Sequence, residues 1–267
     1  MLIDRNTEAI LNLPGKLPFF ATPATSSAKI KSLIERLQPV TFGAELLRLG
    51  PAADGGYLVP NDLGGIAACF SPGVSDICGF EEDCASRGMK VFMADASVEE
   101  PPRAHPSFSF VKKFVGCSTV GEFITLADWV DAAHISSDDD LMLQMDIEGY
   151  EYESLLSAPS ALLQRFRIIV VEFHYLDHLF SEPLYRIYAG VFEKLLLGHS
   201  CVHIHPNNIA GTLKVGDFEI PQMAEFTFLR NDRVRDPKFV TTFPNVLDHD
   251  NFPQHAVVLP RSCFRAG

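Results

Sequence analysis

Short apolar runs alternate with amphipathic segments through the middle of the chain. Apolar runs of strand length lie at residues 66–70, 90–94, 108–115, 141–145, 167–171 and 200–205. Between them, apolar residues recur at helical spacing in segments 80–87, 125–133 and 183–197, and again directly after residue 150. This order of strands and helices predicts an α/β domain with a mostly parallel sheet.

The two ends of the chain depart from this alternation. Residues 1–44 predict a helical lead-in that prolines interrupt, with one capped helix at 26–37. Residues 45–59 predict a hairpin with glycines at its turn, and 222–230 predict a late strand. The last stretch, 231–267, predicts loops with one short strand, Ala256–Leu259. We therefore expect a lead-in over 1–44 and one α/β domain over 45–267.

Polar side chains follow three of the predicted strands. They are, in chain order, Asp146 and Glu148, Glu172 and His174, and His203 and His205, with Asn207 and Asn208 just beyond. Period-two alternation places His203 and His205 on one face of their strand and Val202 and Ile204 on the other. Because parallel strands lie ~5 Å apart and end at one edge of a sheet, we expect the acids and histidines to converge on one cleft.

Two kinds of chemistry fit such a cluster. Carboxylates and imidazoles can hold a divalent cation. Alternatively, one histidine can act as a general base toward a substrate hydroxyl. The sequence does not decide between a cation site and a general base. A third interpretation is that Glu148 and Glu151 only complement the dipole of the following helix.

The first strand–turn–helix unit is a candidate nucleotide site. Its turn contains Gly73 and, further on, Gly79, which is a weaker pattern than G-x-G-x-x-G. Asp95 ends the next strand, 22 residues after Gly73, where an acid can accept hydrogen bonds from ribose hydroxyls. The two features together favour binding of a cofactor that contains adenosine. The alternative interpretation is that residues 71–79 form an ordinary turn and that Asp95 is a solvated acid at the end of a strand.

The net charge and the cysteine pattern limit which partners and which cellular location we expect. The 34 acidic residues outnumber the 22 basic ones and give a net charge of −12, which disfavours nucleic acid and anionic membranes as partners. The six cysteines form no C-x-x-C pair, and the N-terminus lacks the basic start and unbroken apolar core of a signal peptide. We expect reduced thiols and a cytoplasmic location, and homo-oligomers are compatible with the sequence.

Several landmarks in the chain resemble the FkbM-type family of S-adenosylmethionine-dependent methyltransferases. Residues 144–151, Gln-Met-Asp-Ile-Glu-Gly-Tyr-Glu, are similar to the family hallmark K-I-D-V-E-G-x-E, and residues 124–130 are similar to its T-L-D-D-W-L helix. Further similar segments lie in the same order at 48–57, 73–81, 171–174, 203–208 and 225–230. The chain departs from the family at 71–76, where Ser-Pro-Gly-Val-Ser-Asp replaces a glycine-rich turn, and at Gln144, which replaces a lysine.

The resemblance implies a class I methyltransferase fold, which is a Rossmann-like, mostly parallel seven-stranded sheet with an antiparallel last strand and flanking helices. It also implies S-adenosyl-L-methionine as the cofactor. Together with the strand-end pattern, it gives a set of expected cofactor contacts: Arg48, Asp54, Gly56, Tyr57, Gly73, Ser75, Glu81, Asp95, Ala96 and Asp146.

The expected activity is O-methylation of a hydroxyl on a sugar, a glycan or a small secondary metabolite. We expect Asp146, Glu172, His174 and His205 to be catalytic, and Glu148, His203, Asn207 and Asn208 to bind the acceptor. A divalent cation is a further possible cofactor. The rival hypotheses are a nicotinamide-dependent oxidoreductase, a non-catalytic module that keeps the fold, and, last on charge grounds, a nucleic-acid methyltransferase.

Overall fold

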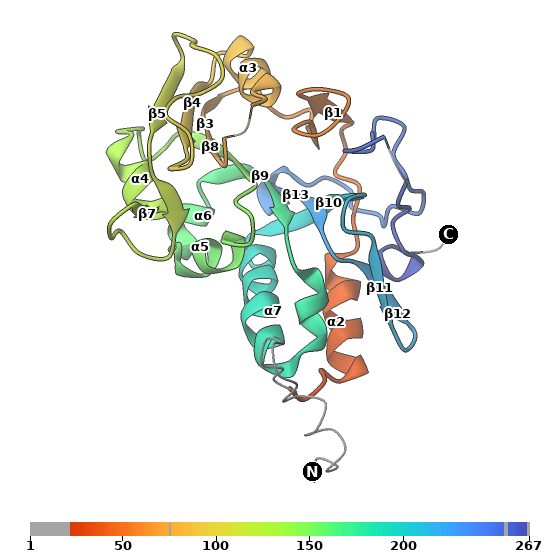
Figure 1. Ribbon diagram of the computed structural model, residues 1–267. Coiled ribbons are helices and arrows are strands. Elements are labelled where there is room, and N and C mark those ends of the chain that lie inside the picture. Colours follow the sequence, from red (N-terminus) through yellow and green to blue (C-terminus); the bar gives the residue numbers. More distant parts are fainter. Residues whose placement is uncertain (1–21, 75, 254–255, 266–267) are drawn as a thin grey trace.

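A seven-stranded sheet forms the centre of the computed structural model, which describes residues 22–74, 76–253 and 256–265 (Figure 1). The order across the sheet is β10-β13-β9-β8-β3-β4-β5. The strands are β3 (Ile66–Pro72), β4 (Lys90–Ala94), β5 (Phe108–Val111), β8 (Asp140–Met145), β9 (Phe166–Phe173), β10 (His199–Pro206) and β13 (Ala224–Arg230). Only β13 runs against its neighbours, pairing antiparallel with both β9 and β10. The predicted mostly parallel sheet is thus confirmed.

The chain builds this sheet outward from its middle. It first runs from β3 through β4 to β5, and then returns to place β8 and β9 on the opposite side of β3. The direction of winding therefore reverses between β3 and β8. At such a switch point the loops after the two strands diverge and leave a crevice at the carboxyl edge of the sheet.

Two apolar cores cover the two faces of the sheet. One face packs against helices α2 (Ser27–Leu37), α4 (Leu126–Ala132), α5 (Glu151–Ser157), α6 (Ser160–Leu163) and α7 (Glu182–Leu196). The other face packs against α3 (Gly79–Ser86) and the antiparallel hairpin of β1 (Leu46–Leu49) and β2 (Tyr57–Pro60). Leu141, Leu143 and Met145 point to the first core and Met142 to the second, as strand alternation requires.

The predicted lead-in is partly described. Residues 1–21 lie outside the described residues, while the helix expected at 26–37 is present as α2. It lies beside α7, with ion pairs from Lys29 to Glu182 and from Arg36 to Glu193 (Figure 1). In the described part of the chain, no helix has the length and apolar character needed to cross a bilayer.

The structure corrects two predicted strands and contains one hairpin that was not predicted. The run 108–115 breaks after β5, and its second half forms β6 (Phe114–Gly116), which pairs with β7 (Phe123–Thr125) outside the main sheet. Residues 256–259 form no strand. A hairpin of β11 (Thr212–Val215) and β12 (Phe218–Pro221), which the pattern did not predict, precedes β13.

A β-bulge in β10 corrects the predicted alternation of that strand. Cys201 pairs with Phe228 and His203 with Thr227, so Val202 is an extra residue without a register partner. Val202 packs in the core on the α3 side, while Ile204 packs in the opposite core. The prediction that Val202 and Ile204 share a face is therefore wrong.

Candidate active site

A cleft of about 280 Å³ lies over the carboxyl ends of β3, β4 and β8, at the switch point of the sheet. Its size is close to the lower end of the range for small-molecule sites. The cleft is lined by Gly73, Ala94, Asp95, Ser97, Phe114, Val115, Phe123, Asp146, Ile147, Glu148 and Tyr150. Three residues predicted from sequence to bind a cofactor, Gly73, Asp95 and Asp146, are among them.

Gly73 lets the loops after β3 and β8 come into contact. Its φ is +93°, and a Cβ at this position would lie 1.7 Å from the carbonyl oxygen of Asp146. Its N–H donates to the carbonyl of Ala94 at 3.1 Å, which ties the same turn to β4. Only glycine combines this left-handed conformation with so close an approach of two backbones.

Asp95 clamps the turn from the β4 side. Its Oδ2 accepts a hydrogen bond from the Val74 N–H at 2.9 Å, and its Oδ1 accepts one from the Ser97 N–H at 2.7 Å. Asp95 is buried within the cleft wall, so it is not the solvated strand-end acid of the alternative reading. Oδ1 also accepts a hydrogen bond from the Ser97 hydroxyl at 2.6 Å, so Oδ2 is the oxygen that keeps a lone pair for a further donor such as a ribose hydroxyl.

Three aromatic rings form one side of the cleft. The ring of Phe123 lies 5.6 Å from Phe114 and 5.5 Å from Tyr150, centroid to centroid. Rings at this spacing offer apolar faces on which a planar base can stack. Sequence reasoning did not assign these rings to the site, because two of them come from the small β6–β7 sheet that the pattern did not predict.

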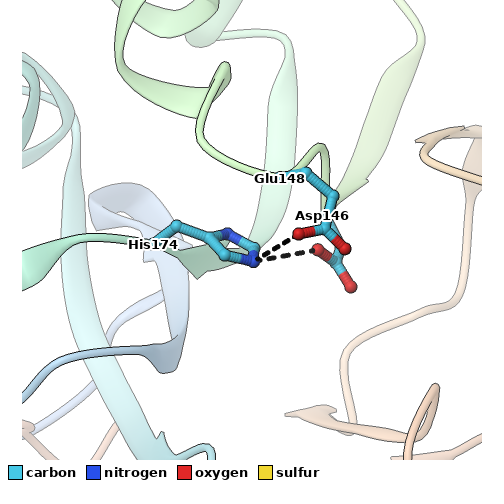
Figure 2. Close-up of side chains that lie close together, drawn as sticks. All are labelled: Asp146, Glu148 and His174. Atoms are coloured by element: carbon cyan, nitrogen blue, oxygen red, sulfur yellow. Dashed lines mark ion pairs between the residues drawn. The ribbon is translucent and has the colours of Figure 1, made fainter. Parts of the chain in front are cut away.

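The polar end of the cleft is a cluster of Asp146, Glu148 and His174, in which both carboxylates approach the same ring nitrogen (Figure 2). The His174 Nε2 lies 3.4 Å from Glu148 Oε2 and 3.9 Å from Asp146 Oδ1. The other ring nitrogen, Nδ1, lies 3.1 Å from Oε1 of Glu151, which is fully buried. The same Glu151 oxygen accepts the N–H groups of Ile147 and Gly149 at 3.1 and 3.0 Å. Glu151 therefore orients both the turn after β8 and the histidine.

Burial sets the protonation of this cluster. It raises the pKa of Asp146 to about 7, and the charges of Glu151 and Glu148 add to this effect against the opposing influence of His174. Burial alone would lower the pKa of His174, but the hydrogen bond and charge of Glu151, with the charge of Asp146, raise it. Asp146 therefore titrates in the range in which proton transfer at neutral pH is efficient.

Further along the same edge lies a row of buried polar residues. His205 pairs across the sheet with Glu225, and Glu225 pairs with Glu172, so all three side chains share one face. Asn207 donates to Glu172 Oε1 at 2.7 Å. Within the described residues, Glu172 Oε2 and both ring nitrogens of His205 have no hydrogen-bond partner.

A C-terminal strap, residues 245–252, attaches to this buried row. The Asp248 Oδ1 lies 2.8 Å from His203 Nε2 and 3.7 Å from His205 Nδ1. Asn251 donates to Glu225 at 3.0 Å and to Asp54 at 3.2 Å. The burial of Asp248 would raise its pKa, but the hydrogen bond from His203 and the nearby ring of His205 lower it below its usual range. Sequence reasoning missed Asp248 and Asn251, which lie in a loop without a periodic pattern.

The other predicted cofactor residues that the structure describes lie outside the lining of the cleft. Arg48 binds its own hairpin turn, donating to the carbonyls of Pro51 and Ala53 at 2.6 and 2.8 Å. The turn requires glycine at position 56, because a Cβ there would lie 2.0 Å from the Pro51 carbonyl oxygen and clash with it.

Three further predicted contacts, Tyr57, Glu81 and Ala96, also lie outside the lining. Tyr57 is buried near the acids of the sheet edge, and burial, followed by the charges of Asp146 and Glu172, raises its pKa. Glu81 is buried and accepts a hydrogen bond from Ser71, which also contacts the Gln144 amide oxygen. Ala96 lies between two lining residues without lining the cleft itself. Ser75 lies outside the described residues.

The predicted convergence on one cleft therefore holds only in part. Asp146, Glu148 and His174 meet beside the cleft, whereas Glu172, His203 and His205 lie in the buried row next to the strap. Asn208 holds the strap by a pair of bonds with the backbone of Phe252.

Residues 87–193 match the family model of the methyltransferase FkbM domain. The resemblance seen in the sequence is thus confirmed. No curated protein matches the chain.

The FkbM match covers part of the site. Asp95, Asp146, Glu148 and His174 lie inside the matched residues, as do the three aromatic rings of the cleft. Gly73, the β1–β2 hairpin, the paired residues His205 and Glu225, and the C-terminal strap lie outside them. The match supports a methyltransferase, and the parts outside it are described by the structure alone.

Proposed function

We propose that the protein is an S-adenosylmethionine-dependent O-methyltransferase that acts on a hydroxyl of a sugar, a glycan or a small secondary metabolite. The observation that carries this proposal is the cleft at the switch point, which opens directly onto the Asp146–Glu148–His174 cluster. A sheet with β13 alone reversed supports a class I methyltransferase fold. The −12 net charge supports an acceptor that is neither nucleic acid nor membrane.

The lining of the cleft fits S-adenosylmethionine. The rings of Phe114, Phe123 and Tyr150 provide a stacking surface for adenine, and the free lone pair of Asp95 Oδ2 can accept a hydrogen bond from a ribose hydroxyl. The backbone contact at Gly73 keeps the methionine side of the cleft free of side-chain bulk. Asp146 lies across from Gly73 and faces the position that we assign to the sulfonium group.

When bound, S-adenosylmethionine supplies the methyl group: the acceptor oxygen bonds to the methyl carbon, the carbon–sulfur bond breaks, and the hydroxyl proton leaves to a base. The protein holds donor and acceptor in line, which removes much of the entropic barrier. The Asp146–Glu148–His174 cluster activates the acceptor hydroxyl beside the cleft. We propose that the reaction takes place in the cytoplasm, where the six free cysteines stay reduced.

Product analysis tests this proposal. The protein is incubated with S-adenosylmethionine and a panel of sugars, oligosaccharides and small alcohols, with amines as the comparison, and S-adenosylhomocysteine release is measured by mass spectrometry. We expect turnover with a hydroxyl acceptor, reduced ~10²–10⁴-fold in His174→Gln and unchanged in His249→Gln, which alters an exposed histidine. Methylation of amines alone would contradict O-methylation. Binding of NAD instead of S-adenosylhomocysteine would contradict the methyltransferase itself.

A further inference from the structure

We infer that Asp146, Glu148 and His174 bind a divalent cation such as Mg²⁺ or Mn²⁺ at the polar end of the cleft. One oxygen of each carboxylate and one ring nitrogen of the histidine all lie within 4.8 Å of one another, which is a spacing that a single ion can span (Figure 2). The role of the ion in methyl transfer rests on the proposed function, but its binding does not.

The buried histidine is the first observation that points to a cation. His174 is only 3 % exposed, and its Nδ1 is held by Glu151 from behind. This contact favours the tautomer with a proton on Nδ1 and leaves the lone pair of Nε2 directed between Asp146 and Glu148. A carboxylate behind a histidine in this way is the usual arrangement around metal-binding histidines.

The unpaired oxygen of Asp146 is the second observation. Asp146 Oδ1 is buried and has no hydrogen-bond partner among the described residues, although it lies only 3.9 Å from His174 Nε2. Leaving a buried carboxylate oxygen without a partner is costly. A bound cation would satisfy this oxygen and offset the charges of the acids that surround one imidazole.

The position of the cluster gives the ion a function. Three protein ligands leave about three positions of an octahedral ion for other oxygens. An acceptor hydroxyl bound at one of these positions would lie beside the donor cleft, and the ion would lower its pKa. The ion would also occupy the Nε2 lone pair, so His174 would act as a ligand rather than as the general base.

Binding of Mn²⁺ alone tests the site, with neither donor nor acceptor present. Electron paramagnetic resonance titrations are compared for the unmodified protein, Asp146→Asn, Glu148→Gln and His174→Gln. The control is Asp131→Asn, which alters an exposed acid on α4. We expect one Mn²⁺ per chain, at least tenfold weaker binding in each of the three cluster variants, and unchanged binding in the control. Glu148 is 86 % exposed at its side chain, so its variant keeps the fold.

Two results would overturn the inference. One is absence of Mn²⁺ binding to the unmodified protein, and the other is equal binding in Glu148→Gln and Asp131→Asn. The titration also separates this inference from the proposed function. Methyl transfer that persists in excess chelator would refute the ion and leave the methyltransferase in place, whereas Mn²⁺ binding without any transfer would support the ion and count against the proposed reaction.

Discussion

Gly73 connects the backbone of two strands at the floor of the cleft. Its N–H bonds to the end of β4, and its α-carbon touches the carbonyl group of Asp146 after β8. The sequence pattern singled out this glycine only as part of a weak turn motif. Its importance comes from a contact between residues 73 positions apart, which local spacing cannot reveal.

We predict that Gly73→Ala lowers the free energy of unfolding by about 2–4 kcal/mol, because it adds a backbone clash to the strain of a positive φ. Gly88→Ala is the matched control, since Gly88 has a φ of +87° but nothing within 4 Å of its added Cβ. It should cost about 1 kcal/mol. Urea denaturation of both variants checks the difference, and equal losses of stability would show that the clash at Gly73 is relieved.

The sequence predicted which residues at the strand ends form the candidate site, but it did not predict which residues hold them in place. Asp146, Glu148 and His174 were predictable because each follows a clear apolar run, and they lie together. Glu151 was interpreted as a helix-dipole charge, whereas its carboxylate holds both His174 and the turn after β8. That contact depends on the loop after β9 passing beside α5, which is a tertiary feature.

At the scale of elements, the C-terminal strap lies at residues 245–252, and the strand that the sequence predicted at 256–259 is absent. The central strands and their mostly parallel direction followed from the alternation of apolar runs with helical segments. The extra residue at Val202 and the break after β5 did not, because a β-bulge and a change of sheet leave the hydrophobic pattern almost unaltered. The strap was unpredictable because polar contacts, rather than apolar periodicity, fix it.

We predict that Asp248→Asn loosens the strap. The variant loses the negative charge that accepts the hydrogen bond from His203 and lies beside His205, and a hydrogen bond to a charged group contributes about 1.5–3 kcal/mol. Hydrogen–deuterium exchange of residues 245–252 should become at least tenfold faster, while exchange in the central sheet stays the same. Asp250→Asn, which alters an exposed acid of the same strap, is the control. Equal exchange in the two variants would mean that other contacts hold the strap.

At the scale of the whole molecule, buried acids at the sheet edge make stability depend on pH in an unusual direction. Burial raises the pKa of Glu225 from 4.5 to about 7, so the folded protein keeps a proton over a range in which the unfolded chain has lost it. Stability must then fall as the pH rises through this range. The burial of His205 would lower its pKa, but Asp248 and Glu225 raise it, so its stabilisation is likewise lost as the pH rises above ~6.5.

We therefore predict greater stability at pH 5 than at pH 8. The contribution of Glu225 to this difference is about 3 kcal/mol, from a pKa change of roughly two to three units. Glu225→Gln should flatten the pH profile by a similar amount, because the amide does not titrate. Urea denaturation of both proteins at the two pH values measures this. A profile that rises toward pH 8 would mean that Glu225 is ionised in the fold at little cost.

Isothermal titration with S-adenosylhomocysteine tests the central claim most directly, namely that the cleft at the switch point between β3 and β8 holds the methyl donor. We predict one binding site per chain, at least tenfold weaker binding in Asp95→Asn, and unchanged binding in Asp139→Asn, an exposed acid far from the cleft lining. Absence of binding to the unmodified protein, or equal affinity in Asp95→Asn, would contradict the account.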